Sequence, residues 1–404
     1  MNRKQFGILL ALVVIVGGIG LSLNSRRAQS WQQSSTGGGQ KLLGKFQVND
    51  VALVSIKATN AELTLLKKDD TWRVKDRQDY PANFSTLTEF LRKAADLKVV
   101  QSEKIGASQL ERMELVQPGK GAGAGTLIEL KDKDGKPLRS LLLGKKQMKK
   151  AESNSPFGGE GWPAGRWIMN LADPTTVALV SDPFSEAEPK AEQWLDKDFF
   201  KVERVRAISV THTNATNSWK LTRETEGGEW KLADAKKDEV LDANKASALG
   251  SPLASPSFND IVSGDAKPAD TGMDQPTVLK LETFDGFTYT VKVGKKSGED
   301  AVHFTMSVSA DLPKERTPGK DEKPEDKDRL DKEFKEKQPK LAEKLGAEKR
   351  FEKFIYLVSK WTVDPLLKER AQLMVEKKEE PKADAGLPGL KLPGLPEIPG
   401  KQDK

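Results

Sequence analysis

The segments LIELKDKDGKPLRSLLLGKK (127–146) and VLKLETFDGFTYTVKVGKK (278–296) decide the fold of this chain. In each segment, apolar and polar residues alternate on both sides of an Asp-Gly dipeptide, and a Gly-Lys-Lys triplet closes the second run. Alternation predicts strands, and Asp-Gly between alternating runs is typical of a hairpin turn because that turn demands positive φ. We therefore expect one β-hairpin in each segment, with turns at Asp134-Gly135 and Asp285-Gly286.

The correspondence continues upstream of both hairpins. VSIKATNAELTLLKKDDTWRVKD, from Val54, and ISVTHTNATNSWKLTRETEGGEWKLAD, from Ile208, share an alternating strand, a Thr-Asn-Ala triplet and a final Trp-basic-aliphatic triplet. A helical pattern follows each of them. In the first copy, apolar residues between 87 and 97 have the spacing of an amphipathic helix, with Ser85 as the expected cap. In the second copy the pattern is weaker, because Gly250 and Pro252 interrupt it.

Downstream of the hairpins, we expect each copy to end in an aromatic strand. On this alignment, Arg166–Met169 corresponds to Phe354–Leu357. The Lys/Glu/Asp-rich segment Leu312–Lys349 then stands where the first copy has Gln147–Gly165. Its apolar residues at near-helical spacing predict a partly helical, highly charged insertion.

Together these patterns predict an α+β fold: a tandem repeat of a mainly antiparallel β unit with one helix, after an N-terminal transmembrane helix. The connector contains Trp194 and Phe199-Phe200 and is expected to be packed, whereas the tail (GLPGLKLPGLPEIPG) is Pro/Gly-rich and expected to be extended. The expected domains are an anchor at 1–28, a flexible tether at 29–48, repeat unit 1 at 49–190, a connector at 191–204, repeat unit 2 at 205–375 with its charged insertion at 312–349, and a disordered tail at 376–404.

The stretch Gly119–Gly125 (GKGAGAG) raises the question of a phosphate-binding loop. It lacks the Lys-Ser/Thr pair of a Walker loop, and a strand rather than a helix is predicted after it. In the second copy, Gln275-Pro276 leads directly into the corresponding strand without these glycines. The pattern therefore favours an inserted, mobile surface loop over a phosphate site.

The N-terminus contains 18 residues without a charge, Phe6 to Leu23. A helix of that length spans about 27 Å, close to the hydrocarbon thickness of a membrane. Arg26-Arg27 interrupts a small-residue cleavage site, so an uncleaved signal anchor is favoured over a cleaved signal peptide. We expect a single-pass inner-membrane protein with its C-terminal body outside the cytoplasm, in the periplasm.

Composition excludes some classes of function. The net charge of +6 comes from 66 basic and 60 acidic residues, without a dense basic block, so nucleic acid is not an expected partner. The chain has no cysteine, which excludes disulfides, thiolate nucleophiles and cysteine zinc sites.

Residues for catalysis or metal binding are not evident. His212 and His303 lie in alternating strand patterns, without the spacing of a metal site or a nucleophile motif. Carboxylate pairs such as Asp69-Asp70 and Asp196/Asp198 are expected by chance among 60 acidic residues. The features shared by the two copies are structural residue types. We therefore expect no enzyme activity and name no catalytic, cofactor-binding or metal-binding residue.

This arrangement resembles the bacterial family of domain of unknown function 4340 (DUF4340). The resemblance rests on the hairpin ending in Trp-basic-aliphatic, the helix, the Pro-preceded strand and the strand closing on glycine, over Val51–Ala178 and again over Ile208–Leu367. It implies a membrane-anchored extracytoplasmic body, associated in some members with ABC-type export systems of the gliding-motility kind. It supplies no catalytic residues. The glycine segment, the charged insertion and the Pro-rich tail depart from the family pattern.

The favoured function is therefore a non-enzymatic scaffold or accessory protein of an envelope complex, with ABC transporter components as candidate partners. One alternative is a ligand-binding module that holds a solute or glycan between the two copies. A third is a hydrolase.

Overall fold

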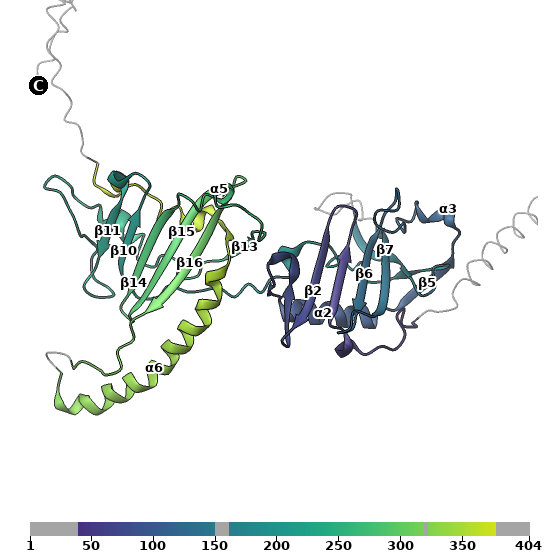
Figure 1. Cartoon of the computed structure of the whole chain (residues 1–404), viewed down its shortest axis with the longest axis horizontal. Coiled ribbons are helices and arrows are strands. Elements are labelled where there is room, and N and C mark those ends of the chain that lie inside the picture. The colour runs from purple at the N-terminus through teal and green to yellow at the C-terminus, as the bar shows by residue number, and fades with distance from the viewer. Residues whose placement is uncertain (1–38, 150–160, 319–321, 377–404) are drawn as a thin grey trace, which may run out of the picture.

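The computed structural model describes residues 39–149, 161–318 and 322–376. Its strands form two sheets, in which neighbouring strands pair antiparallel, and a few helices accompany them. The two sheets follow one another along the long axis of the molecule, and the long helix α6 (Lys327–Lys349) extends from the second (Figure 1). The expected α+β class, with mainly antiparallel sheets, is confirmed.

The first sheet has the strand order β4-β3-β2-β1-β6-β7-β8-β9-β5. Its strands are β1 (Leu53–Lys57), β2 (Glu62–Lys68), β3 (Thr71–Val74), β4 (Tyr80–Pro81), β5 (Val99–Lys104), β6 (Thr126–Lys131), β7 (Pro137–Lys149), β8 (Trp162–Asn170) and β9 (Thr176–Val180). The accompanying helices are η1 (Val48–Asp50), η2 (Lys75–Arg77), α2 (Phe84–Asp96), α3 (Ala107–Leu110) and η3 (Ala191–Gln193).

The second sheet has the order β12-β11-β10-β14-β15-β16-β17-β13. Its strands are β10 (Val205–Thr211), β11 (Trp219–Thr222), β12 (Lys231–Leu232), β13 (Phe258–Ile261), β14 (Thr277–Thr283), β15 (Phe287–Ser297), β16 (Ala301–Ala310) and β17 (Tyr356–Ser359). The helices, besides α6, are η4 (Ala215–Asn217), α4 (Ala243–Ser247), α5 (Pro268–Thr271), η5 (Pro324–Asp326), η6 (Arg350–Lys353), α7 (Lys360–Val363) and η7 (Arg370–Leu373).

Once the short strand β4 is set aside, the two strand orders correspond position by position. The irregularities of pairing also correspond. The register of β7 with β8 shifts between Leu143 and Lys146, and that of β15 with β16 shifts between Val293 and Lys296. Both Asp-Gly turns are present, and their glycines have the predicted positive φ, 79° at Gly135 and 83° at Gly286.

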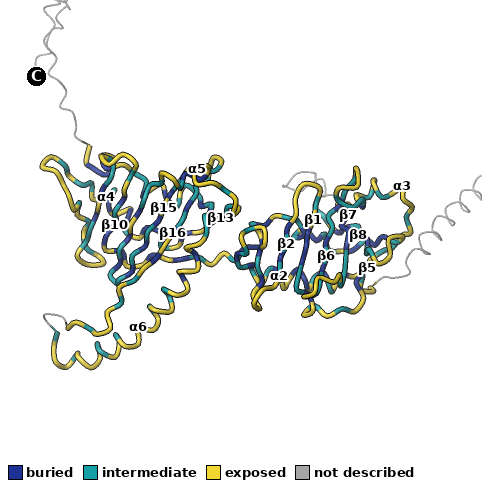
Figure 2. The backbone as a smooth tube through the Cα atoms, viewed as in Figure 1, coloured by how far each residue is buried: buried dark blue, intermediate teal, exposed yellow. Residues whose placement is uncertain are grey.

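The buried apolar residues of the core lie on the strands of both sheets and on the helices packed against them (Figure 2). Strand β15 shows how the sequence builds it, since Phe287, Tyr289, Val291 and Val293 alternate with more exposed residues and are all buried. Helix α2 buries Leu87, Phe90, Leu91 and Ala94 and exposes its other face, as its spacing predicted. One continuous cluster of buried apolar side chains includes residues of both sheets and of the connector.

The predicted cap of α2 was wrong by two residues. The helix begins at Phe84, so Ser85 lies inside its first turn. The capping residue is Asn83, whose side-chain oxygen accepts a hydrogen bond from the Thr86 N–H at 3.0 Å.

The predicted alignment at the end of the second unit was also wrong. The counterpart of β8, which contains Arg166–Met169, is β16, whereas Tyr356–Ser359 forms β17 at the position of β9. The charged insertion therefore follows β16, at the place of the short turn between β8 and β9, and not the place of Gln147–Gly165. The aromatic residues of both strands misled the alignment, because alternation alone does not distinguish neighbouring strands.

The apolar run Phe6–Leu23 and the Pro-rich tail lie outside the described residues. Among the helices that are described, none combines the length and the apolar character needed to cross a membrane.

Candidate interaction surfaces

No catalytic residue was predicted, and both histidines of the chain lie near backbone carbonyl oxygens. His212 Nε2 lies 3.3 Å from the Lys368 carbonyl oxygen, and His303 Nδ1 lies 2.8 Å from the Lys295 carbonyl oxygen. Asp69 and Asp70 occupy a turn, both with positive φ. Within the described residues, no group of three or more acidic or histidine side chains is arranged to hold a metal ion.

Among the open cavities at the surface of the described residues are three with volumes of ≈ 580, ≈ 530 and ≈ 520 Å³. The first lies between the β2–β3 and β6–β7 turns, among Lys67, Asp70, Asp132 and other charged residues. Asp70 pairs there with Lys67 at 3.1 Å while its own side chain is 97% exposed. The charges of this cavity are therefore largely solvated, which argues against a built ligand site.

The glycine segment is a surface loop whose C-terminal part is hydrogen-bonded to Val116, the residue before Gln117-Pro118. The Val116 N–H donates to the Gly123 carbonyl oxygen at 3.1 Å, and the Gly125 N–H donates to the Val116 carbonyl oxygen at 2.9 Å. A Cβ atom at Gly125 would lie 2.3 Å from the Leu143 carbonyl oxygen, so the glycine is required by close backbone packing. Strand β6 follows the loop, as predicted, so no helix N-terminus is available for a phosphate.

The shared Gly-Lys-Lys triplets have a structural explanation for their glycines. A Cβ atom at Gly144 would lie 2.4 Å from the Met113 carbonyl oxygen, and one at Gly294 would lie 2.2 Å from the Thr271 carbonyl oxygen. In the first sheet, the segment that contains α3 packs its backbone against β7 at Gly144. In the second sheet, the segment that contains α5 packs its backbone against β15 at Gly294. Both strands have a shift of register there. No side chain fits there, and the lysines that follow are left at the surface.

The junction between the sheets is built around a clasp, which we define as the ion pair of Arg77 and Asp260. The Arg77 Nε and Nη2 groups donate to the two Asp260 carboxylate oxygens at 2.7 and 2.8 Å. The side chains are only 23% and 21% exposed. Hydrogen bonding to Asp260 raises the pKa of Arg77. Gln78 Nε2 adds a hydrogen bond of 2.8 Å to the Val262 carbonyl oxygen. This two-pronged geometry fixes orientation as well as distance.

Aromatic rings fill the space beside the clasp. Tyr80, on β4 of the first sheet, makes edge contacts with Phe258, Phe354 and Tyr356 of the second, with centroids 5.7, 4.9 and 6.2 Å apart. Burial raises the pKa of Tyr80, so the phenol stays neutral. Lys197 of the connector lies 4.6 Å over the Phe258 ring, and burial lowers its pKa. The junction is thus a packed interface rather than an open cleft.

The outer edges of the two sheets do not repeat the clasp. Strand β5, at the outer edge of the first sheet, corresponds to β13 in the second. Gln101 of β5 pairs with β9 at the position where Asp260 of β13 pairs with β17. Aligning the Trp-basic-aliphatic triplets places Ala235 at the position of Arg77. The ion pair is therefore specific to the junction between β4 and β13 and has no counterpart at the outer edges among the described residues.

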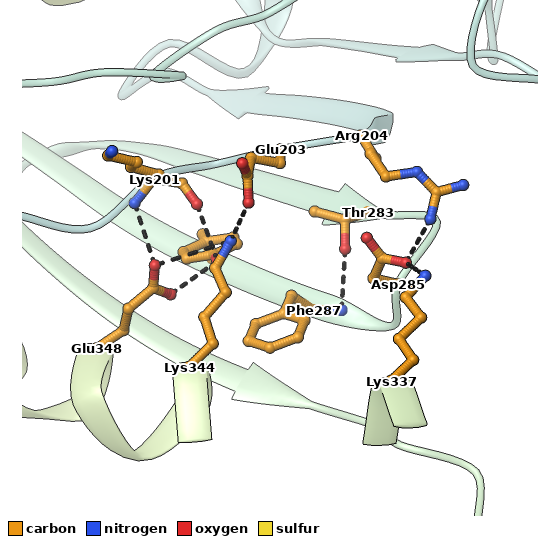
Figure 3. A network of polar contacts seen from close by, with 10 residues as sticks. Lys201, Glu203, Arg204, Thr283, Asp285, Phe287, Lys337, Lys344 and Glu348 are labelled. Carbon is orange, nitrogen blue, oxygen red and sulfur yellow. Dashed lines mark hydrogen bonds and ion pairs between the residues drawn. The ribbon is translucent and has the colours of Figure 1, made fainter. Parts of the chain in front are cut away.

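Helix α6 is anchored at its C-terminal end (Figure 3). Glu348, only 6% exposed, accepts hydrogen bonds from the Tyr289 hydroxyl at 2.8 Å and the Lys201 N–H at 3.1 Å. Lys344 pairs with Glu203 at 2.6 Å and lies 5.6 Å over the Phe287 ring. A buried carboxylate needs such donors, so these contacts fix the direction in which the helix leaves the sheet.

The outer half of α6, which we define as residues 327–338, extends away from the second sheet (Figure 1), and Lys337 near its inner end pairs with Asp285 of the β14–β15 turn (Figure 3). Its charges alternate in sign, with i,i+4 pairs such as Arg329–Glu333 and Lys332–Glu336. Arg316 bonds to Glu322 and Asp331 and ties the preceding loop to the helix. The sequence predicted the helix, but its anchor residue Glu348 was missed, because a buried glutamate looks like any other in a charged run.

The comparison with protein families gives one match where the resemblance predicted two, so it does not show two copies of the family domain. A family model, Domain of unknown function (DUF4340), matches residues 72–276. The chain belongs to the DUF4340 family. The match is a single one that begins in β3 and ends just before β14, so it crosses the junction and includes both residues of the clasp. No curated protein and no solved structure matches the chain.

Proposed function

We propose that this DUF4340 protein is a membrane-tethered, non-enzymatic scaffold or accessory protein of an envelope complex. Its body is two copies of one ancestral unit, held outside the cytoplasm by the apolar run Phe6–Leu23. A permease and its ATPase of the ABC type are the partners to test first, on the resemblance to family members associated with such exporters.

The observation that carries the proposal is the projecting half of α6, together with the anchor that holds it. The outer half of this charged helix contacts the second sheet through the Lys337–Asp285 ion pair and the loop before it through Arg316. It buries little apolar surface, which leaves it exposed for a partner. Glu348, Lys344 and the bidentate clasp hold this helix and the two sheets in one orientation. A fixed, exposed arm on a rigid body suits protein recognition, because the interface is ordered before the partner arrives.

The ligand-binding alternative is less well supported. Aromatic rings occupy the junction where a solute between the units would bind. The three cavities described above are lined by residues of one sheet or the other, not both. No observation favours the hydrolase alternative, and among the described residues both histidines lie near backbone carbonyl oxygens.

The test is to crosslink the tagged full-length protein mildly in its own membrane, recover it by affinity and identify bound proteins by mass spectrometry. The arm variant is Glu333→Lys with Glu336→Lys, which removes the alternation of charge and leaves the anchor unchanged. The matched control is Glu224→Lys with Glu229→Lys, on the exposed loop between β11 and β12.

We expect the wild type and the control to recover the same envelope proteins, and the arm variant to lose them. Failure of the wild type to recover any protein reproducibly would refute the scaffold proposal. Equal recovery by the arm variant would show that the outer half of α6 is not the contact.

A further inference from the structure

Two tryptophans stand out at the surface of the described residues. Trp361 is 73% exposed and Trp162 is 52% exposed, and Met148, which precedes the cross-strand partner of Trp162, is 48% exposed. An indole left in water forgoes the large burial that makes tryptophan favourable in a core. None of these three side chains belongs to the clasp or to α6.

The two tryptophans lie at corresponding ends of the two sheets. Trp162 pairs with Lys149 at the loop end of the β7–β8 hairpin, where β7 ends and β8 begins. Trp361 follows β17, whose Ser359 pairs with Ala301 where the β15–β16 hairpin turns. Helix α3 lies close to the segment that packs on Gly144 of β7, and α5 belongs to the segment that packs on Gly294 of β15. Both helices lie on the upper side of the view in Figure 1. The two hairpin ends therefore face the same side of the molecule.

The first hairpin end is also basic. It presents Lys145, Lys146 and Lys149, and none of them lies within ion-pair distance of a carboxylate among the described residues. The hydrogen bond from Lys190 lowers the pKa of Glu188, and the nearby Lys146 contributes to that shift. The Lys149 ammonium lies 5.6 Å over the Trp162 ring, which pairs a cation with an aromatic face. Close backbone packing explains why the Gly-Lys-Lys triplet begins with glycine. It does not explain why lysines follow at 145, 146 and 149.

The second hairpin end is electrically balanced. Lys295 donates from Nζ to the Ala269 carbonyl oxygen at 2.7 Å, and Glu299 and Asp300 are exposed on the turn. Its contribution is therefore the indole of Trp361 rather than charge.

We propose that these two hairpin ends rest on an anionic lipid surface, with Trp162 and Trp361 at the depth of the headgroups and the lysines of the first hairpin against lipid phosphates. Tryptophan prefers the membrane interface because one part of its ring system is apolar and its N–H is polar. Lysines beside it are attracted to anionic headgroups within a Debye length. The contact needs a membrane nearby, and in that respect it rests on the proposed tether.

The reach of the chain permits this contact. Residues 24–38 separate the apolar run from the first described residue, Gly39. Fifteen extended residues span at most about 50 Å. The docked body would lie with one long side on the membrane and would present α6 at a fixed height.

The chain has no cysteine, so single-cysteine labels report one position each. We would place an environment-sensitive fluorophore on Met148→Cys or Trp361→Cys in the full-length protein. The control is Lys133→Cys, in the β6–β7 turn at the opposite end of β7, about 40 Å away along the strand. Each protein is reconstituted into vesicles of phosphatidylcholine alone or of phosphatidylcholine with phosphatidylglycerol, both containing a nitroxide-labelled lipid as the quencher.

We expect quenching of the labels at 148 and 361 in the anionic vesicles, much weaker quenching in phosphatidylcholine, and none at 133. Adding Lys145→Ser and Lys149→Ser to the 148-labelled protein should lower the docking equilibrium constant by about thirtyfold, the factor for two lysines at an anionic surface. Equal quenching at 148 and 133, or no difference between the two lipids, would overturn the proposal.

The outcome separates this inference from the proposed function. A failure of the tether would appear as protein that does not co-float with phosphatidylcholine vesicles, whatever the label does. A failure of the scaffold role would leave the quenching intact, because the assay contains no protein partner.

Discussion

The clasp between the sheets makes a quantitative prediction. Arg77→Ala leaves the Asp260 carboxylate, 21% exposed, without its two charge-assisted hydrogen bonds of 2.7 and 2.8 Å. Hydrogen bonds to charged groups contribute about 1.5–3 kcal/mol when buried, and exposed ion pairs about 0.2–1 kcal/mol. For a pair with about a fifth of its surface in water, we expect each single substitution to cost about 2 kcal/mol and the pair to show a coupling energy of about 1 kcal/mol.

The assay is a double-mutant cycle of Arg77→Ala and Asp260→Ala in urea unfolding. The matched control is a cycle on Lys231 and Glu224, an ion pair of 2.7 Å whose side chains are 67% and 82% exposed. We expect a coupling below about 0.5 kcal/mol for that exposed pair. A distance measurement between spin labels at Lys133→Cys and Glu229→Cys, one in each unit, supplies a readout of orientation. The distribution of distances between the two labels should broaden in Arg77→Ala. A clasp coupling no larger than that of the control, with an unchanged distance distribution, would refute the argument that the ion pair fixes the junction.

Three further predictions concern local structure and pH. Asn83→Ala should cost about 1 kcal/mol in the free energy of unfolding, because α2 loses its side-chain cap; an unchanged midpoint in urea would contradict that role. Gly294→Ala should destabilise by about 1–3 kcal/mol, since its Cβ meets a backbone carbonyl oxygen at 2.2 Å. Gly346→Ala, in the open interior of α6, should instead stabilise by up to about 1 kcal/mol, and thermal unfolding compares the two. The Arg370 guanidinium lowers the pKa of Glu239 from 4.5 to about 2, so this carboxylate stabilises the fold above its unfolded pKa and loses that contribution as pH falls from 4.5 toward 2. Glu239→Gln should therefore flatten the acid limb of stability against pH, and an unchanged slope would show that the shift has another cause.

Local patterns in the sequence carried much of the fold. The alternation around Asp134-Gly135 and Asp285-Gly286 predicted hairpins with positive φ at both glycines, and the spacing from Leu87 onward predicted α2. These predictions succeeded because period and turn chemistry are properties of neighbouring residues.

What the sequence did not predict depends on contacts between distant residues. Arg77 and Asp260 are 183 residues apart, and each looks like one charged residue among many in a chain with 66 basic and 60 acidic side chains. Glu348 was missed for the same reason. A usable signal existed in the repeated Gly-Lys-Lys, because a glycine at the same place in both units indicates close backbone packing. The placement of the charged insertion was wrong because adjacent aromatic strands share one alternating pattern.

The central claim is that a rigid two-sheet body presents the outer half of α6 to an envelope protein. The most direct test places a photoreactive amino acid at Lys335, exposed on that half of α6, in the full-length protein in its own membrane. The same residue at Lys133, exposed in a turn of the first sheet, is the control. The account predicts a discrete crosslinked partner at 335, identified by mass spectrometry, and none at 133. The same products at both positions, or none at 335, would contradict it.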